Sequence, residues 1–266
     1  MDRSAIRSQL PTLVAGHLPR NIHRFKFLVY DDQPQESSLG FLIDPKPFEG
    51  TVIAKIDAAI VIKVARTQFA VLDRQLATQD PAIGTRVAVV PYARHHFDGA
   101  RLDTPAEETR YTADGEPYTV RSVILGGGTT KLPIPEPRCP ELEALVQQLQ
   151  EMPAPDGFRR ITHLLVDAGA GDFAWMDPSA ADIIRTPPAI SFSVDTTKFR
   201  GRVTVLYERG LDLYAVELHH GASLVERVDA VSFDGLGETL ERLIDDGSWR
   251  RIRVETLPGK SARIRH

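Results

Sequence analysis

Four short apolar runs follow one another between residues 51 and 91 with little chain between them. They are Thr51 to Ile56, Ala59 to Val64, Gln68 to Leu72 and Arg86 to Pro91. Only Asp57 and Ala58 separate the first two runs, which predicts a tight antiparallel hairpin. Strands this short and this closely connected leave no room for parallel crossovers. We therefore expect a small antiparallel β-barrel of the OB or SH3 kind, closed or nearly closed over Thr51 to Val90.

A further strand, Tyr118 to Leu125, is expected to complete this barrel after a polar loop at Asp103 to Glu116. The three glycines 126–128 and four nearby prolines then disfavour both helix and central strand. The predicted division is a lead segment 1–48, a barrel module 49–130, a Pro/Gly-rich linker 131–140, an α+β domain 141–256 and a basic tail 257–266.

The second predicted domain combines helices with an antiparallel sheet. Pro140 is well placed to begin a helix whose apolar stripe includes Leu142, Leu145 and Leu149. Three strand-like runs follow at Arg202 to Tyr207, Leu213 to Leu218 and Leu224 to Val231, and a helical apolar face then ends near Gly247. Strands grouped together, and not alternating with helices, predict an α+β fold for the whole chain.

Composition limits the environment and the partners of the chain. Its 266 residues carry a formal net charge of -4, which excludes a globally basic nucleic-acid binder. Its single cysteine, Cys139, cannot form an intramolecular disulfide framework and fits a reducing compartment. No stretch approaches the roughly 20 apolar residues of a membrane span. We therefore expect a cytoplasmic protein that has no membrane partner.

Several patterns that resemble catalytic or cofactor motifs are incomplete. Residues 126–131 combine glycines with Lys131 but lack the spacing of a phosphate loop. The two pairs His95-His96 and His219-His220 have no ligand spacing, so we predict no metal site, although a metal-dependent hydrolase that uses these pairs stays an alternative. No serine lies in a nucleophile elbow. The sequence thus predicts no catalytic residue and no cofactor, and favours a protein that is not an enzyme.

One segment resembles a known family. Gly50 to Ala54, Ile60 to Lys63, Phe69 to Arg74 and Ile83 to Val89 look like the small β module of plasmid-borne KfrB-type proteins, a resemblance that covers residues 49–101. The resemblance implies a gene carried by a conjugative or integrative element and a product that works near DNA processing or as a partner of such machinery. It implies no reaction.

Basic residues beside aromatic ones suggest local contact with nucleic acid. We predict weak, salt-sensitive binding with little sequence preference, in which cations attract phosphates and two aromatic rings stack on bases. The predicted stacking residues are Phe69 and Tyr92, and the predicted cations are Lys63, Arg66, Arg74, Arg94, Arg251, Arg253, Lys260, Arg263 and Arg265.

These observations favour a non-enzymatic accessory or adaptor protein of a mobile genetic element, whose ligand is nucleic acid or a protein partner. The alternatives are the metal-dependent hydrolase and a protein-binding inhibitor of host machinery. A large exposed apolar patch would indicate a protein partner, whereas a basic groove beside Phe69 and Tyr92 would indicate nucleic acid.

Overall fold

The structure is a computed structural model, and it describes residues 1–22, 24–122, 124, 126 and 128–258. The chain forms two compact units that are interleaved in sequence. The first contains Met1–Glu36, Ile43–Ala93 and the chain from Trp249 on, and the second contains Ser37–Leu42 and Arg94–Ser248. The chain therefore leaves the first unit after Ala93 and re-enters it at Trp249.

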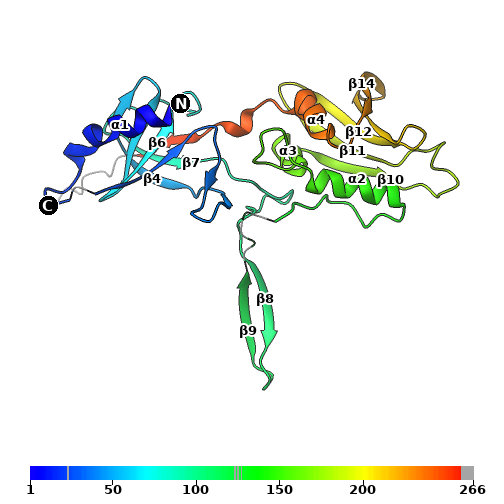
Figure 1. The fold of residues 1–266 in the computed structure, drawn as a ribbon, viewed down its shortest axis with the longest axis horizontal. Helices are drawn as coiled ribbons and strands as arrows, with labels where there is room; N and C mark the ends of the chain where they lie inside the picture. Colours follow the sequence, from blue (N-terminus) through cyan, green and yellow to red (C-terminus); the bar gives the residue numbers. More distant parts are fainter. Residues whose placement is uncertain (23, 123, 125, 127, 259–266) are drawn as a thin grey trace. The chain divides into compact units, whose positions relative to one another are not determined.

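The first unit is built on a six-stranded sheet (Figure 1). Its order is β1 (Lys26–Tyr30), β6 (Gln68–Asp73), β5 (Ala59–Ala65), β4 (Phe48–Ile56), β7 (Arg86–Val90) and β15 (Arg253–Thr256). Strands β1 and β6 are parallel, and the other neighbours are antiparallel. The predicted hairpin is confirmed, because Ile56 pairs with Ala59 across the turn at Asp57 and Ala58.

Both faces of this sheet are buried. On one face, helix α1 (Arg3–Val14) places Ile6, Leu10 and Val14 against a cluster that includes Val61 and Val71. The cluster on the other face comes from the strands themselves, from residues 76 and 77 and from Ile252, and contains no helical residue of the described chain. These strands therefore bury that face against one another, which requires a curved sheet.

The predicted barrel is wrong, because none of the sheets is closed. Strands β1 and β15 remain as edges of the first sheet. One comes from the predicted lead segment, and the other comes from within residues 141–256. The strand Tyr118 to Leu125 was expected to complete the barrel. Its residues 118–122 instead lie in β9 (Pro117–Ser122), which pairs with β8 (Ala106–Tyr111), where a polar loop was expected. Residues 123 and 125 of that predicted strand lie outside the described residues.

The α+β class is also wrong for the chain as a whole, which is mostly β. The described residues contain fifteen strands and only four α-helices. Two of the strands, β2 (Gln35–Glu36) and β3 (Leu42–Ile43), form a short ladder, and two 3-10 turns lie at Ala15–His17 and Ser248–Arg250. Local apolar patterns identified α2, α4 and several strands, but the α+β class did not anticipate how many of the elements are strands.

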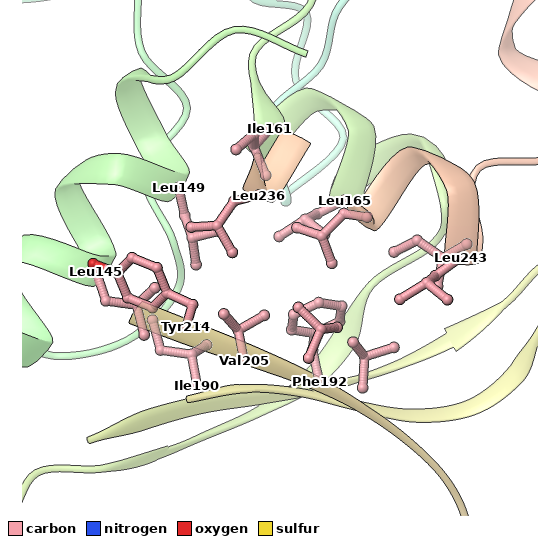
Figure 2. Packing of buried hydrophobic residues seen from close by; sticks show 14 of the residues in the cluster. Leu145, Leu149, Ile161, Leu165, Ile190, Phe192, Val205, Tyr214, Leu236 and Leu243 are labelled. Carbon is pink, nitrogen blue, oxygen red and sulfur yellow. The ribbon is translucent and has the colours of Figure 1, made fainter. Parts of the chain in front are cut away.

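The second unit is a five-stranded antiparallel sheet with helices on one face. The strands lie in chain order: β10 (Gly171–Met176), β11 (Ala189–Asp195), β12 (Arg200–Glu208), β13 (Leu213–His220) and β14 (Ser223–Val231). The helices are α2 (Pro140–Glu151), α3 (Ile161–Asp167) and α4 (Leu236–Ile244), so the helices predicted from Pro140 and before Gly247 are confirmed. Figure 2 shows Leu145, Leu149, Leu165 and Leu243 of the helices facing Phe192 and Val205 of the sheet.

Candidate protein-binding site

The cations predicted to bind nucleic acid do not form one surface. Arg94 belongs to the second unit and is only 4% exposed, with its guanidinium carbon 4.7 Å from the ring centroid of Phe158. The Nζ of Lys63 donates a hydrogen bond to the carbonyl of His17 at 2.6 Å. Arg74 pairs with Asp80 at 2.6 Å.

Of the remaining predicted cations, Arg253 pairs with Glu255, with 2.7 Å between Nε and the carboxylate. Arg66 and Arg251 are exposed. Lys260, Arg263 and Arg265 lie outside the described residues. Burial, an ion pair or a hydrogen bond thus engages four of the six described cations of the predicted set.

The two predicted stacking rings are engaged inside the first unit. Phe69 is 3% exposed, and its ring meets Phe25 edge-on with centroids 5.7 Å apart. Tyr92 packs against Trp249 with ring centroids 4.7 Å apart. Phe69 is buried because helix α1 covers its face of the sheet, and the sequence analysis did not predict that helix. In this structure Phe69 offers no face to a base.

The histidine pairs make local contacts. The Nδ1 of His96 lies 3.2 Å from the hydroxyl of Thr130, and the Nε2 of His219 lies 2.9 Å from Glu217. The His220 ring stacks on Phe199. Among the residues that the structure describes, no group of three or more His, Cys, Asp or Glu side chains is arranged to hold a metal ion. The geometry therefore offers no support for the hydrolase alternative.

The second unit contains a buried group of charges around Arg159. Its side chain pairs with Asp156 at 2.9 Å, with Asp167 at 2.8 Å and with Asp245. Burial alone would lower the pKa of Arg159, but these carboxylates raise it. One guanidinium thus pairs with three carboxylates, one in a loop and two at helix ends.

His163 lies close to this group at the start of α3. Its Nδ1 accepts a hydrogen bond from the backbone N–H of Arg160, so the ring proton is on Nε2. Burial lowers the pKa of His163 to about 3, and the charges of Arg94, Arg160 and Arg159 and the ring of His96 act in the same direction. The Nε2 atom is buried and has no hydrogen-bond partner within the described residues. His163 is therefore a neutral core group at neutral pH.

A tight turn at Ser37–Leu42 holds two apolar side chains out to solvent. The hydroxyl of Ser37 accepts hydrogen bonds from the backbone N–H groups of Leu39 and Phe41 at 3.3 and 3.0 Å, and the N–H of Ser37 donates to the carbonyl of Phe41 at 2.8 Å. Gly40 supplies the positive φ, 78°, that the turn needs. Leu39 is 75% exposed and Phe41 is 40% exposed. The turn fixes its own backbone while these two side chains stay uncovered.

Phe41 extends this apolar surface to the segment after β9. A Cβ built on Gly126 would lie 3.6 Å from Cδ1 of Phe41, and one built on Gly128 would lie 3.3 Å from Cδ1 of Ile124. Ile124 is 69% exposed. We call Leu39, Phe41 and Ile124 the apolar patch. Ile124 belongs to the segment Tyr118 to Leu125 that was predicted to complete the barrel.

Strands β8 and β9 form a two-stranded hairpin, which we call the arm. Every residue of the arm's strands is exposed except the half-buried Val120. Cross-strand ion pairing links Glu107 to Arg121 at 2.8 Å, and Glu108 pairs with Arg110 along β8 at 3.0 Å. The arm was not predicted from the sequence, although Asp114-Gly115 between two runs rich in Thr and Tyr is a recognised hairpin signal.

Comparison with known proteins adds no relative. No family model matches the chain, and no match was found among curated proteins or solved structures. The resemblance of residues 49–101 to the KfrB-type module therefore stays a prediction.

Proposed function

We propose that this protein is a non-enzymatic adaptor that binds another protein through the apolar patch. The observation that carries the proposal is the exposure of Leu39 and Phe41 on a turn whose backbone is already fixed by Ser37. Exposed clusters of apolar side chains are typical of surfaces that bind another molecule. The occupant that fits is a protein segment that presents apolar side chains to Leu39, Phe41 and Ile124.

The rigid turn supports this proposal energetically. The loss of conformational freedom in loops and side chains that become ordered on binding opposes association. Four hydrogen bonds within residues 37–41 already order the backbone of this turn. Binding there would therefore order little additional backbone. Less of the favourable free energy of the apolar contact would be offset by lost conformational entropy, and the affinity would be higher.

The charge of the arm, whose strand β9 ends two residues before Ile124, favours a protein over a nucleic acid as the partner. The arm between residues 106 and 122 contains four acidic residues (Glu107, Glu108, Asp114, Glu116) and two basic residues (Arg110, Arg121), for a net charge of 2 - 4 = -2. Negative charge opposes the approach of phosphates. Nucleic-acid binding by the first unit and the C-terminal tail stays a prediction from the sequence.

The setting of the adaptor is also a proposal. The KfrB-type resemblance suggests a mobile genetic element, and the single cysteine suggests the cytoplasm. No helix of the described residues is long and apolar enough to cross a membrane. An inhibitor of host machinery would use the same kind of surface, so the identity of the bound protein would separate these two roles.

Site-specific photo-crosslinking tests the proposal. A benzophenone side chain placed at Leu39 of the full chain, irradiated in cells that carry the gene, should give adducts of defined mass. The matched control is Ile83, which is similarly exposed but lies in the first unit. We expect the main adduct from position 39 to be absent from position 83.

The crosslinked protein is then purified and its affinity is measured. Phe41→Asp should weaken binding of that protein at least tenfold, because it places a charge in an apolar contact, whereas Ile83→Asp should leave binding unchanged. Identical adducts from both positions, or equal affinity for wild type and Phe41→Asp, would contradict the proposal.

A further inference from the structure

Within the described residues, the outer edge of β8 pairs with no other strand. The N–H of Thr112 donates to the carbonyl of Glu116 at 2.9 Å, which makes these two residues a hydrogen-bonded pair. Hydrogen-bonded and non-hydrogen-bonded pairs alternate along an antiparallel ladder. Arg110, Glu108 and Ala106 therefore bond to β9. The backbone groups of Tyr111, Thr109 and Glu107 point away from β9, to the outer edge.

The outer edge of β9 is less suited to pairing. By the same alternation, its outward residues are Pro117, Thr119 and Arg121, which lie opposite Tyr111, Thr109 and Glu107. Pro117 has no N–H, so this edge lacks a donor at its first position. Prolines on edge strands are a common protection against unwanted pairing. The arm thus presents one open edge and one partly blocked edge.

The open edge is self-complementary in charge. If two copies of β8 lie antiparallel with Thr109 opposite Thr109 of the second copy, Glu108 of each copy lies opposite Arg110 of the other. The outward backbone N–H and C=O groups of Glu107 then pair with those of Tyr111 in the second copy. Those of Thr109 pair with those of Thr109 in the second copy. A shift by two residues in either direction separates the opposite charges. Directly opposed unlike charges stabilise strand pairs, and like charges destabilise them.

We propose that two copies of this chain associate through β8 into a four-stranded antiparallel sheet with the order β9, β8, β8, β9. The twofold axis passes through the Thr109 pair, so the contact is isologous and closes at two copies. Each Arg110 then lies between Glu108 of its own strand, 3.0 Å away in the single chain, and Glu108 of the second copy. An isolated two-stranded hairpin is only marginally stable in water, so pairing into four strands also stabilises the arm. This inference uses a different surface from the apolar patch and does not depend on it.

Sedimentation velocity of the full chain over a range of concentrations tests the proposal, with a dimer expected that dissociates on dilution. Thr109→Pro removes the central donor of the open edge, while the corresponding N–H makes no bond within the hairpin. Thr119→Pro is the matched control, because Thr119 lies directly opposite and points to the other edge. We expect at least a tenfold weaker dimer for Thr109→Pro and an unchanged dimer for Thr119→Pro.

A charge exchange tests the register independently of any loss of folding. Glu108→Arg should weaken the dimer at least tenfold, because it places two arginines opposite each other. Arg110→Glu in the same chain should restore dimerisation, because both opposed pairs are again unlike. Any one of three results would overturn the proposal. They are a wild-type chain that is monomeric at every concentration, equal dimerisation of the two proline variants, and no recovery of dimerisation in the double variant.

Discussion

The two large sheets bury their residues in different ways. In β5 of the first sheet, the four consecutive residues Ala59, Ile60, Val61 and Ile62 are all buried. In β11 of the second sheet, Ile190, Phe192 and Val194 are buried, whereas the residues between them remain partly exposed. Successive side chains of a strand point to opposite faces. An uninterrupted apolar run therefore marks a sheet covered on both sides, and an alternating run marks one open face.

What covers each face explains the difference. In the first sheet, α1 covers one face and the curved strands enclose the other. In the second sheet, the helices cover one face, and the other carries polar side chains such as Ser191 and Thr204, whose hydroxyls lie 3.0 Å apart. A polar open face is ordinary for an antiparallel sheet that packs on one side only.

The largest effect is expected on the covered side of the second unit. Arg159→Met removes a buried cation that pairs with three carboxylates and should lower the free energy of unfolding by about 3–5 kcal/mol. Arg200→Met is the control, because Arg200 forms an exposed pair with Asp195 and should cost less than about 1 kcal/mol. Urea unfolding monitored by circular dichroism measures both. Equal midpoints for the two variants would contradict the structural role of Arg159.

Two neighbouring truncations test the claim that both faces of the first sheet are buried. Ile62→Ala and Val61→Ala remove side chains from opposite faces, and each is fully buried. We expect a loss of about 2–4 kcal/mol for Ile62→Ala and a slightly smaller loss for Val61→Ala, because each leaves a cavity in a packed core. Chemical denaturation provides the values. If Val61→Ala had no effect, α1 would not cover its face.

Acid should destabilise the second unit through His163. Its pKa is about 3 in the folded chain and about 6.5 when unfolded. Below pH 6.5 the unfolded chain therefore takes up a proton that the folded chain does not. The stabilisation is complete above pH 6.5 and is lost as the pH falls toward 3, with a slope of up to about 1.4 kcal/mol per pH unit.

His163→Asn keeps an acceptor for the N–H of Arg160 and should reduce this slope. The measurement is the free energy of unfolding in urea at several values between pH 7 and pH 4. His220→Asn, a change at an exposed ring, is the control and should preserve the slope. The assignment to His163 fails if both variants show the wild-type dependence.

The smallest effect is expected on the open face of the second sheet. Ser193 is adjacent to the fully buried Phe192 but lies on the other face and is partly exposed. Ser193→Ala should change the free energy of unfolding by less than about 0.5 kcal/mol. A thermal or urea unfolding curve is sufficient for the comparison. A loss near that of Ile62→Ala would show that this face is covered as well.

Local patterns predicted the elements better than their arrangement. The two-residue turn at Asp57 and Ala58 and the apolar stripe of α2 are encoded by neighbouring residues, and both were predicted. The pairing of β1 with β6 and of β15 with β7 joins distant segments, and no local pattern specifies it. The barrel was predicted because the pairing of these two edge segments with the rest of the sheet was not recognised.

The candidate site was predicted less well than the fold. Phe69 was interpreted as an exposed ring because α1, which covers it, was not predicted. Leu39 and Phe41 lie in a segment of mixed composition, and a sequence does not show whether an apolar residue in a turn is covered. Their exposure becomes visible only when the Ser37 turn and the glycines near Ile124 are placed together.

The interleaving of the two units affects the order in which a growing chain can fold. Chains emerge from the ribosome N-terminus first, and domains usually fold as units during synthesis. All residues of the second unit have been made once Ser248 has been added, whereas Val254, which pairs with Val89, has not. During synthesis, β7 must therefore wait with one edge unpaired while more than a hundred residues are added. If the second unit folds early, the chain between Ala93 and Trp249 acts as a shorter loop. The entropic cost of closing the first sheet is then lower.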